Sequence, residues 1–139
     1  MTKNLKIMLV DDDALSFEVL AAALESLGHD AIKREQALGT MLAIRREKPD
    51  VVLLDVHMPG LSGDALTKLI VSSKDSHEPI ILLHSATERT ELARLSASCG
   101  AAGWIEKSSN PGEFLRRFSQ LVDDTMEQRR RKKNPARTG

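Results

Sequence analysis

The chain has 139 residues, 41% of them hydrophobic and 29% charged, which is typical of one soluble globular domain with its own core. The longest apolar run, residues 19–24, is far shorter than the roughly 18 residues that span a bilayer, and the single cysteine excludes a disulfide framework, so we expect a cytoplasmic location. Residues 1–128 hold 14 Lys and Arg against 20 Asp and Glu, a net charge of −6, whereas residues 129–139 hold six basic residues and no acid.

The first half of the chain is predicted to alternate strands with helices. Residues 7–10 form a continuous apolar run, which is typical of a strand covered on both faces. Apolar residues then recur at helical spacing, and Gly28 favours a helix end behind them. The residues of that helical face are Phe17, Leu20, Leu24 and Leu27. The short and more polar residues 30–33 suit an edge strand, and a second helix is expected through Leu38, Met41, Leu42 and Arg45.

The second half of the chain repeats the alternation. Residues 51–54, 80–83 and 101–105 are further apolar strand candidates. Ser62 could cap the helix between the first two, and another helix opens at Thr87 or Glu88 and closes at Gly100. Pro111 stands where a final helix begins. Five strand–helix repeats predict an α/β fold, in which a doubly wound parallel sheet carries helices on both faces.

Polar residues follow the predicted strands where each strand ends. Asp11 and Asp12 follow the first strand, Asp55 the third, Ser85 the fourth and Lys107 the fifth. An open doubly wound sheet binds its ligand at the carboxyl ends of its strands, so these side chains are expected to converge. Carboxylates that lie close together repel, and Mg²⁺ relieves that repulsion with oxygen ligands. Together with an ammonium group, such a site is suited to hold a phosphoryl group beside a metal.

These motifs resemble the receiver domain of two-component response regulators, over residues 5–125. The motifs are the run LVDDD at residues 9–13, the segment DVHMPGLSG at residues 55–63, Ser85-Ala86, and Lys107. The resemblance implies a flavodoxin-like (βα)5 sheet with strand order 2-1-3-4-5. It also implies that residues 1–128 are the receiver domain. Residues 129–139 are expected to be a flexible tail, because a run of basic residues is usually solvated.

The resemblance further implies a role for each residue of the site. Asp55 would accept a phosphoryl group from the phosphohistidine of a sensor histidine kinase or a phosphotransfer protein. Mg²⁺, or Mn²⁺ in its place, would be bound by Asp11, Asp12, Asp55 and the backbone carbonyl of His57. Lys107 and Ser85 would hold phosphoryl oxygens. The protein would be a bacterial signalling switch that catalyses only its own phosphorylation and autodephosphorylation, and not an enzyme with a separate substrate.

The resemblance also implies that phosphorylation changes a surface to which another protein binds. By the resemblance, Ser85 moves toward the phosphoryl group and the aromatic Trp104 turns inward, while His57 and Thr87 tune dephosphorylation. The changed surface would be the fourth helix, the fifth strand and the fifth helix, which together bind a downstream protein. Ser108 stands where the family usually has a proline after a cis peptide bond, so the Lys107–Ser108 peptide is expected to be either trans or strained cis.

Several alternatives stay open at this stage. The runner-up is a pseudo-receiver, an interaction module that phosphorylation does not switch, and a small metal-dependent phosphatase is a third reading. His84 and Ser85 should point to opposite faces of their strand, which argues against a hydrolase triad. His29 and His77 are expected in solvated loops. The receiver is expected to be a monomer or weak homodimer without sequence-specific nucleic-acid binding, and the partner of the basic tail is left unspecified.

Overall fold

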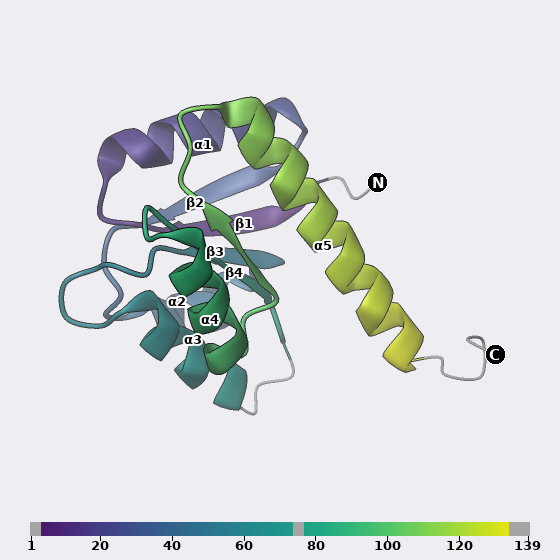
Figure 1. Cartoon of the computed structure of the whole chain (residues 1–139). Coiled ribbons are helices and arrows are strands. Elements are labelled where there is room, and N and C mark those ends of the chain that lie inside the picture. The colour runs from purple at the N-terminus through teal and green to yellow at the C-terminus, as the bar shows by residue number, and fades with distance from the viewer. Residues whose placement is uncertain (1–3, 74–76, 134–139) are drawn as a thin grey trace.

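The computed structural model describes residues 4–73 and 77–133, and Figure 1 shows them as a sheet enclosed by helices. The strands are β1 (Lys6–Val10), β2 (Asp30–Arg34), β3 (Val51–Leu54), β4 (Ile80–Ser85) and β5 (Gly103–Glu106). The helices are α1 (Ala14–Ser26), α2 (Thr40–Glu47), α3 (Gly63–Ser72), α4 (Arg89–Cys99) and α5 (Pro111–Lys133). Within the described ranges, no helix is long and apolar enough to cross a membrane.

All strand pairs are parallel, and the sheet order is β2-β1-β3-β4-β5. The predicted fold class and strand order are therefore confirmed. α1 and α5 cover one face of the sheet, and α2, α3 and α4 cover the other (Figure 1). The interior holds two hydrophobic cores, one on each face of the sheet, and successive residues of a strand pack into opposite cores. Leu53 packs with Leu24 and Phe118, whereas Leu54 packs with the residues of α2 to α4.

Several helix ends are capped by residues that favour such positions. Asp13 caps α1, because its Oδ1 accepts hydrogen bonds from the amides of Leu15 (3.1 Å) and Ser16 (3.4 Å). Ser62 caps α3 by accepting from the amide of Ala65. Gly100 ends α4 with a φ of +87°, a conformation that glycine adopts without a Cβ clash. The cap of α1 also fixes where the chain leaves β1, directly beside the predicted site.

The second helix differs from its prediction. α2 begins at Thr40, so Leu38 lies before it, and its side chain is 82% exposed. Thr40 is instead fully buried, because its hydroxyl donates to the carbonyl of Gln36 and so needs no water. His29 is a second correction: it is buried rather than solvated, and its Nδ1 accepts a hydrogen bond from the amide of Leu5 (3.1 Å).

The basic segment is helical over its first part. α5 continues without a break through residue 133, so residues 129–133 form the end of this helix. Arg129 fixes this extension, because its guanidinium donates to the carbonyls of Glu78 (2.6 Å) and Pro79 (3.2 Å) in the loop before β4. The rest of the predicted tail, residues 134–139, lies outside the described residues.

Candidate functional site

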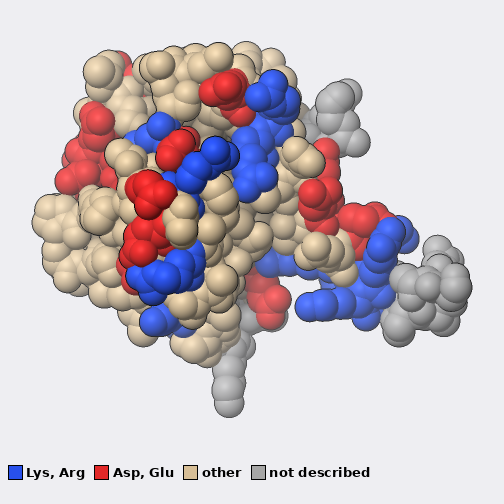
Figure 2. Space-filling model, in the orientation of Figure 1, with Lys and Arg blue, Asp and Glu red and all other residues tan. Residues whose placement is uncertain are grey.

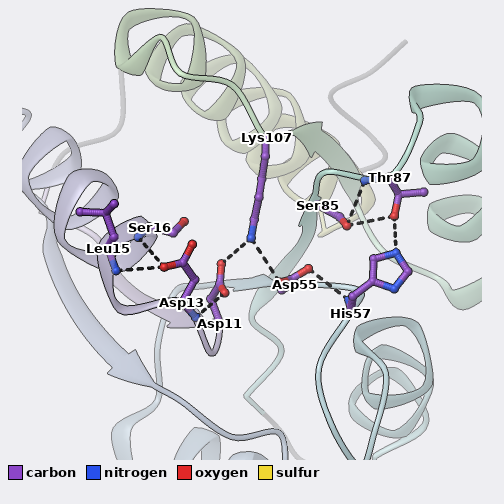
Figure 3. Close-up of polar contacts among 9 residues, drawn as sticks. All are labelled: Asp11, Asp13, Leu15, Ser16, Asp55, His57, Ser85, Thr87 and Lys107. Atoms are coloured by element: carbon purple, nitrogen blue, oxygen red, sulfur yellow. Dashed lines mark hydrogen bonds and ion pairs between the residues drawn. The ribbon is translucent and has the colours of Figure 1, made fainter.

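The carboxyl ends of β1, β3 and β5 bring three charged side chains together. Lys107 Nζ lies 2.9 Å from Asp11 Oδ2 and 3.2 Å from Asp55 Oδ2 (Figure 3). Both carboxylates are only 6% exposed. The backbone aligns these residues, because the Asp55 amide donates to the carbonyl of Val10 and the Lys107 amide donates to the carbonyl of Ser85. One ammonium group therefore lies between two buried carboxylates.

Asp12 completes an acidic cluster with these two carboxylates. One carboxylate oxygen from each of Asp11, Asp12 and Asp55 lies within 4.8 Å of the others. Asp11 Oδ1 accepts from the amide of Asp13 (2.9 Å), whereas its buried Oδ2 is paired with the Lys107 ammonium group (2.9 Å). The three clustered carboxylates form an all-oxygen donor set, which fits a hard divalent cation such as Mg²⁺.

Burial and charge act against each other at this cluster. Burial raises the pKa of Asp55 above its ordinary value, although the His57 amide and the Lys107 ammonium both act to lower it. Burial acts to lower the pKa of Lys107, but its hydrogen bonds and ion pairs with Asp11 and Asp55 outweigh this effect and leave that pKa raised. Lys107 is thus held as a cation, and added positive charge would favour the ionised form of Asp55.

Gly63 is a site residue whose role was not singled out from the sequence. It is the first residue of α3, and a Cβ atom there would overlap the backbone carbonyl oxygen of Asp55. Gly63 also donates its amide to the carbonyl of Val56. A glycine at the start of a predicted helix, shortly after Asp55, is the signal that could have indicated this close approach.

The loops after β3 and β4 meet through a chain of polar contacts. His57 donates its amide to Asp55 Oδ1 (3.1 Å), and its ring Nε2 shares a hydrogen bond with Thr87 Oγ1 (2.6 Å). Thr87 Oγ1 lies 3.0 Å from Ser85 Oγ, which also accepts from the Thr87 amide (Figure 3). The four predicted residues Asp55, His57, Ser85 and Thr87 are therefore connected through these contacts.

Trp104 and His84 lie on opposite faces of the sheet. Trp104 on β5 is half-buried, and the Arg117 guanidinium lies over its ring, 5.1 Å from the ring centroid. The hydroxyl of Ser85 pairs with Thr87, whereas the His84 ring packs edge-on against Phe114 of α5 (5.5 Å between ring centroids), as strand alternation predicts. Burial, followed by the charge of Lys107, lowers the pKa of His84 to about 4. No cis peptide occurs among the described residues, so the Lys107–Ser108 bond is trans.

Comparison with known proteins gives relatives of one kind. The chain is 37% identical over 118 residues to Protein PilH of Pseudomonas aeruginosa, which covers 84% of this chain and 97% of that protein. It is 32% identical over 116 residues to the DNA-binding response regulator MtrA of Mycobacterium tuberculosis. That match covers 84% of this chain but 50% of MtrA, so the chain spans about half the length of this relative.

Solved structures agree with these relatives. The BeF3-activated receiver domain of Klebsiella pneumoniae RstA matches with a TM-score of 0.75 and 29% identity, over 84% of this chain and 97% of that one. The chemotaxis response regulator CheY4 of Vibrio cholerae shares the fold, with a TM-score of 0.77 and 22% identity, over 86% and 99% of the two chains. The family description "response regulator receiver domain" matches residues 7–119. The chain therefore belongs to the response regulator receiver domain family.

Proposed function

We propose that Asp55 accepts a phosphoryl group from the phosphohistidine of a sensor histidine kinase or a phosphotransfer protein. Receiver domains are signalling switches of two-component systems, and this chain belongs to that family. The observation that carries the proposal is the Lys107 ammonium group, which contacts both Asp11 and Asp55 beside three clustered carboxylates. A carboxylate nucleophile, a fixed cation and an oxygen-ligand cluster are the parts that phosphoryl transfer requires.

In the proposed step, an Asp55 carboxylate oxygen attacks phosphorus in line with the leaving imidazole. The P–N bond of the phosphohistidine breaks and its electron pair stays on the imidazole nitrogen, so an aspartyl phosphate forms. No general base is needed, because the attacking group is already a carboxylate. Lys107 would move from its ion pairs to a phosphoryl oxygen. A later attack of water on phosphorus would release inorganic phosphate and restore the carboxylate.

Mg²⁺, or Mn²⁺ in its place, would be held by Asp11, Asp12, Asp55 and the backbone carbonyl of His57. When bound, the ion would neutralise negative charge on the phosphoryl oxygens. The carboxylate oxygens of Asp11, Asp12 and Asp55 support this assignment, because they lie within 4.8 Å of one another. The raised pKa of Asp55 supports it as well, because a nearby divalent cation favours the ionised carboxylate that must attack.

We further propose that Ser85 and Trp104 move when Asp55 is phosphorylated, and that His57 and Thr87 set the lifetime of the phosphorylated state. Ser85 hydrogen-bonds to Thr87, so a shift of Ser85 toward the phosphoryl group would also move Thr87 and weaken its bond to His57. The response would reach a downstream protein through α4, β5 and α5. We further propose that the protein acts in the bacterial cytoplasm as a monomer or weak homodimer.

Intact-mass measurement after incubation with Mg²⁺ and acetyl phosphate tests the proposed acceptor. We expect the wild-type chain to gain one phosphoryl group and Asp55→Asn to gain none. Asp64→Asn, which removes an acid from the first turn of α3, is the matched control and should gain the group normally. No gain in the wild type, or an equal gain in Asp55→Asn, would refute the proposal and favour the pseudo-receiver, whose surface is not switched by phosphorylation.

A further inference from the structure

A cleft of about 400 Å³ lies at the amino-terminal edge of the sheet, where Pro79 and Ala102 lead into β4 and β5. The end of α3 forms one side of this cleft, and the end of α5 forms another. Because Asp55 and Lys107 follow the carboxyl ends of their strands, the cleft lies at the opposite edge of the sheet from them. We call it the α3–α5 cleft, and the lining residues that matter most here are Ile70, Val71, Pro79, Ile81, Arg129 and Lys132.

The floor of the α3–α5 cleft is apolar and recessed. Ile70, Pro79 and Ile81 line it and are buried, and the half-exposed side chain of Val71 adds an apolar wall. A flat protein surface contacts the rim of such a cleft, whereas a thin aliphatic chain reaches its floor. A volume of about 400 Å³ also lies within the range of pockets that hold small molecules. The floor therefore fits the apolar part of a small ligand.

Two cations stand at the rim of the cleft. The Arg129 guanidinium is held in place, because it donates to the carbonyls of Glu78 (2.6 Å) and Pro79 (3.2 Å). These bonds use two of its five N–H groups, and the other three have no partner in the described ranges. Lys132 is exposed and makes no hydrogen bond or ion pair with any described residue. Figure 1 shows α5 running on past the sheet, and Figure 2 shows Lys and Arg side chains gathered at its end.

The charges of the cleft limit which anion can bind there. Glu78 is the one acid among the lining residues, and its exposed carboxylate repels any anion that the two cations attract. The net attraction is therefore weak, and the apolar floor has to supply part of the affinity. A free phosphate or acetate ion makes no use of that floor. Nucleic acid fits poorly as well, because no described Phe or Trp lines the cleft to stack on a base.

We propose that the α3–α5 cleft binds a small amphipathic carboxylate, whose carboxylate group pairs with Arg129 and Lys132 and whose aliphatic chain lies on the apolar floor. A carboxylate matches the planar guanidinium group, and a single negative charge suits the small positive surplus of the rim. Such a ligand would connect the end of α3 with the last turns of α5. Because a helix end frays easily, the added contacts should slow amide hydrogen exchange in residues 129–133.

The test titrates sodium octanoate, below its micelle concentration, into the ¹⁵N-labelled full chain. We expect saturable shifts of the Gly100 and Ala102 amide signals, because both residues line the cleft. Each methylene that enters the cleft should lower Kd about fourfold, so octanoate should bind about 15-fold more tightly than hexanoate. 1-Octanol carries the same chain without the charge and should bind about threefold more weakly. Hydrogen exchange with and without octanoate then measures the effect on the end of α5.

Matched variants place the ligand in the cleft. Lys132→Gln should raise the Kd for octanoate about threefold, whereas Lys133→Gln, which changes an exposed neighbour outside the cleft, should not change it. Val71→Asp should raise Kd at least about tenfold, because it places a like charge on the apolar wall. Leu69→Asp changes a similarly exposed apolar residue of α3 outside the cleft and is its control. Glu78→Gln should lower Kd about twofold. Circular dichroism verifies that each variant is folded.

Several results would overturn the inference. They are the absence of saturable shifts at Gly100 and Ala102, binding of acetate or 1-octanol as tight as that of octanoate, and equal effects of Val71→Asp and Leu69→Asp. The site does not rest on the proposed phosphorylation, which the mass measurement on Asp55 tests separately. If Asp55 gains a phosphoryl group but octanoate does not bind, this inference fails alone. If octanoate binds a chain that gains no mass, the phosphorylation proposal fails and the cleft remains a ligand site.

Discussion

Replacing Lys107 with methionine removes the charge that lies between two buried carboxylates while keeping a similar unbranched side chain. At an effective dielectric constant of about 20, two unit charges at most 4.8 Å apart repel by about 3 kcal/mol or more. Loss of one partner from a fully buried pair costs roughly 3–5 kcal/mol. The Lys107 side chain is 25% exposed, so water screens part of this effect. We expect Lys107→Met to lower the free energy of unfolding by about 2–3 kcal/mol in EDTA.

Urea unfolding followed by circular dichroism measures this loss, with Lys68→Met on the exposed side of α3 as the control. Two further results follow from the same physics. Saturating Mg²⁺ should stabilise Lys107→Met more than the wild type, because the ion then relieves a larger repulsion. Adding Asp55→Asn to Lys107→Met should recover stability, because one of the two repelling charges is gone. Equal Mg²⁺ stabilisation of both proteins, or a double variant that is weaker still, would refute the reasoning.

Two more predictions concern the histidines near the site. The pKa of His84 is lowered from 6.5 to about 4 in the folded chain. Between these two pH values the unfolded chain binds a proton at His84 that the folded chain does not bind. The free energy of unfolding therefore falls as the pH falls through this window. His84→Leu should remove about 2–3 kcal/mol of the stability difference between pH 7 and pH 4.5 in urea unfolding, and an undiminished acid sensitivity would contradict this. His57→Ala breaks the hydrogen bond to Thr87, so the phosphorylated chain should lose its phosphoryl group roughly fivefold faster by time-resolved mass measurement. An unchanged rate would count against a role for His57 in that lifetime.

The strands and the place of the site were predictable from the sequence for one physical reason. A parallel sheet covered on both faces needs continuous apolar strands, so residues 7–10, 51–54 and 80–83 are unmistakable. The carboxyl ends of such strands share one edge, which brings Asp11, Asp55 and Lys107 into contact. The two ends of each strand were less predictable: β4 extends to Ser85, because its last residues still pair with β5.

Features that depend on contacts between distant segments were missed. The spacing of apolar residues does not reveal whether a helix face meets the core or the solvent. Leu38 and Leu42 were therefore placed on the predicted second helix, although both are exposed, and the residues that α2 buries are Thr40, Ala43 and Ile44. The bond between His57 and Thr87 joins loops 30 residues apart. Arg129 likewise meets carbonyls about 50 residues away in the chain, which no charge run reveals.

The sheet divides the interior into two cores that share backbone but not side chains. Met8, Leu54 and Leu83 belong to one core, and Leu53 and Phe118 to the other. Substitutions in different cores have no common packing neighbours, so their costs in unfolding free energy should add, whereas substitutions within one core should not. Changes beneath α3 and α4 therefore leave the packing beneath α1 and α5 intact, and the reverse holds as well. Each face of the sheet can thus acquire substitutions whose costs in stability do not depend on what the other face has already acquired.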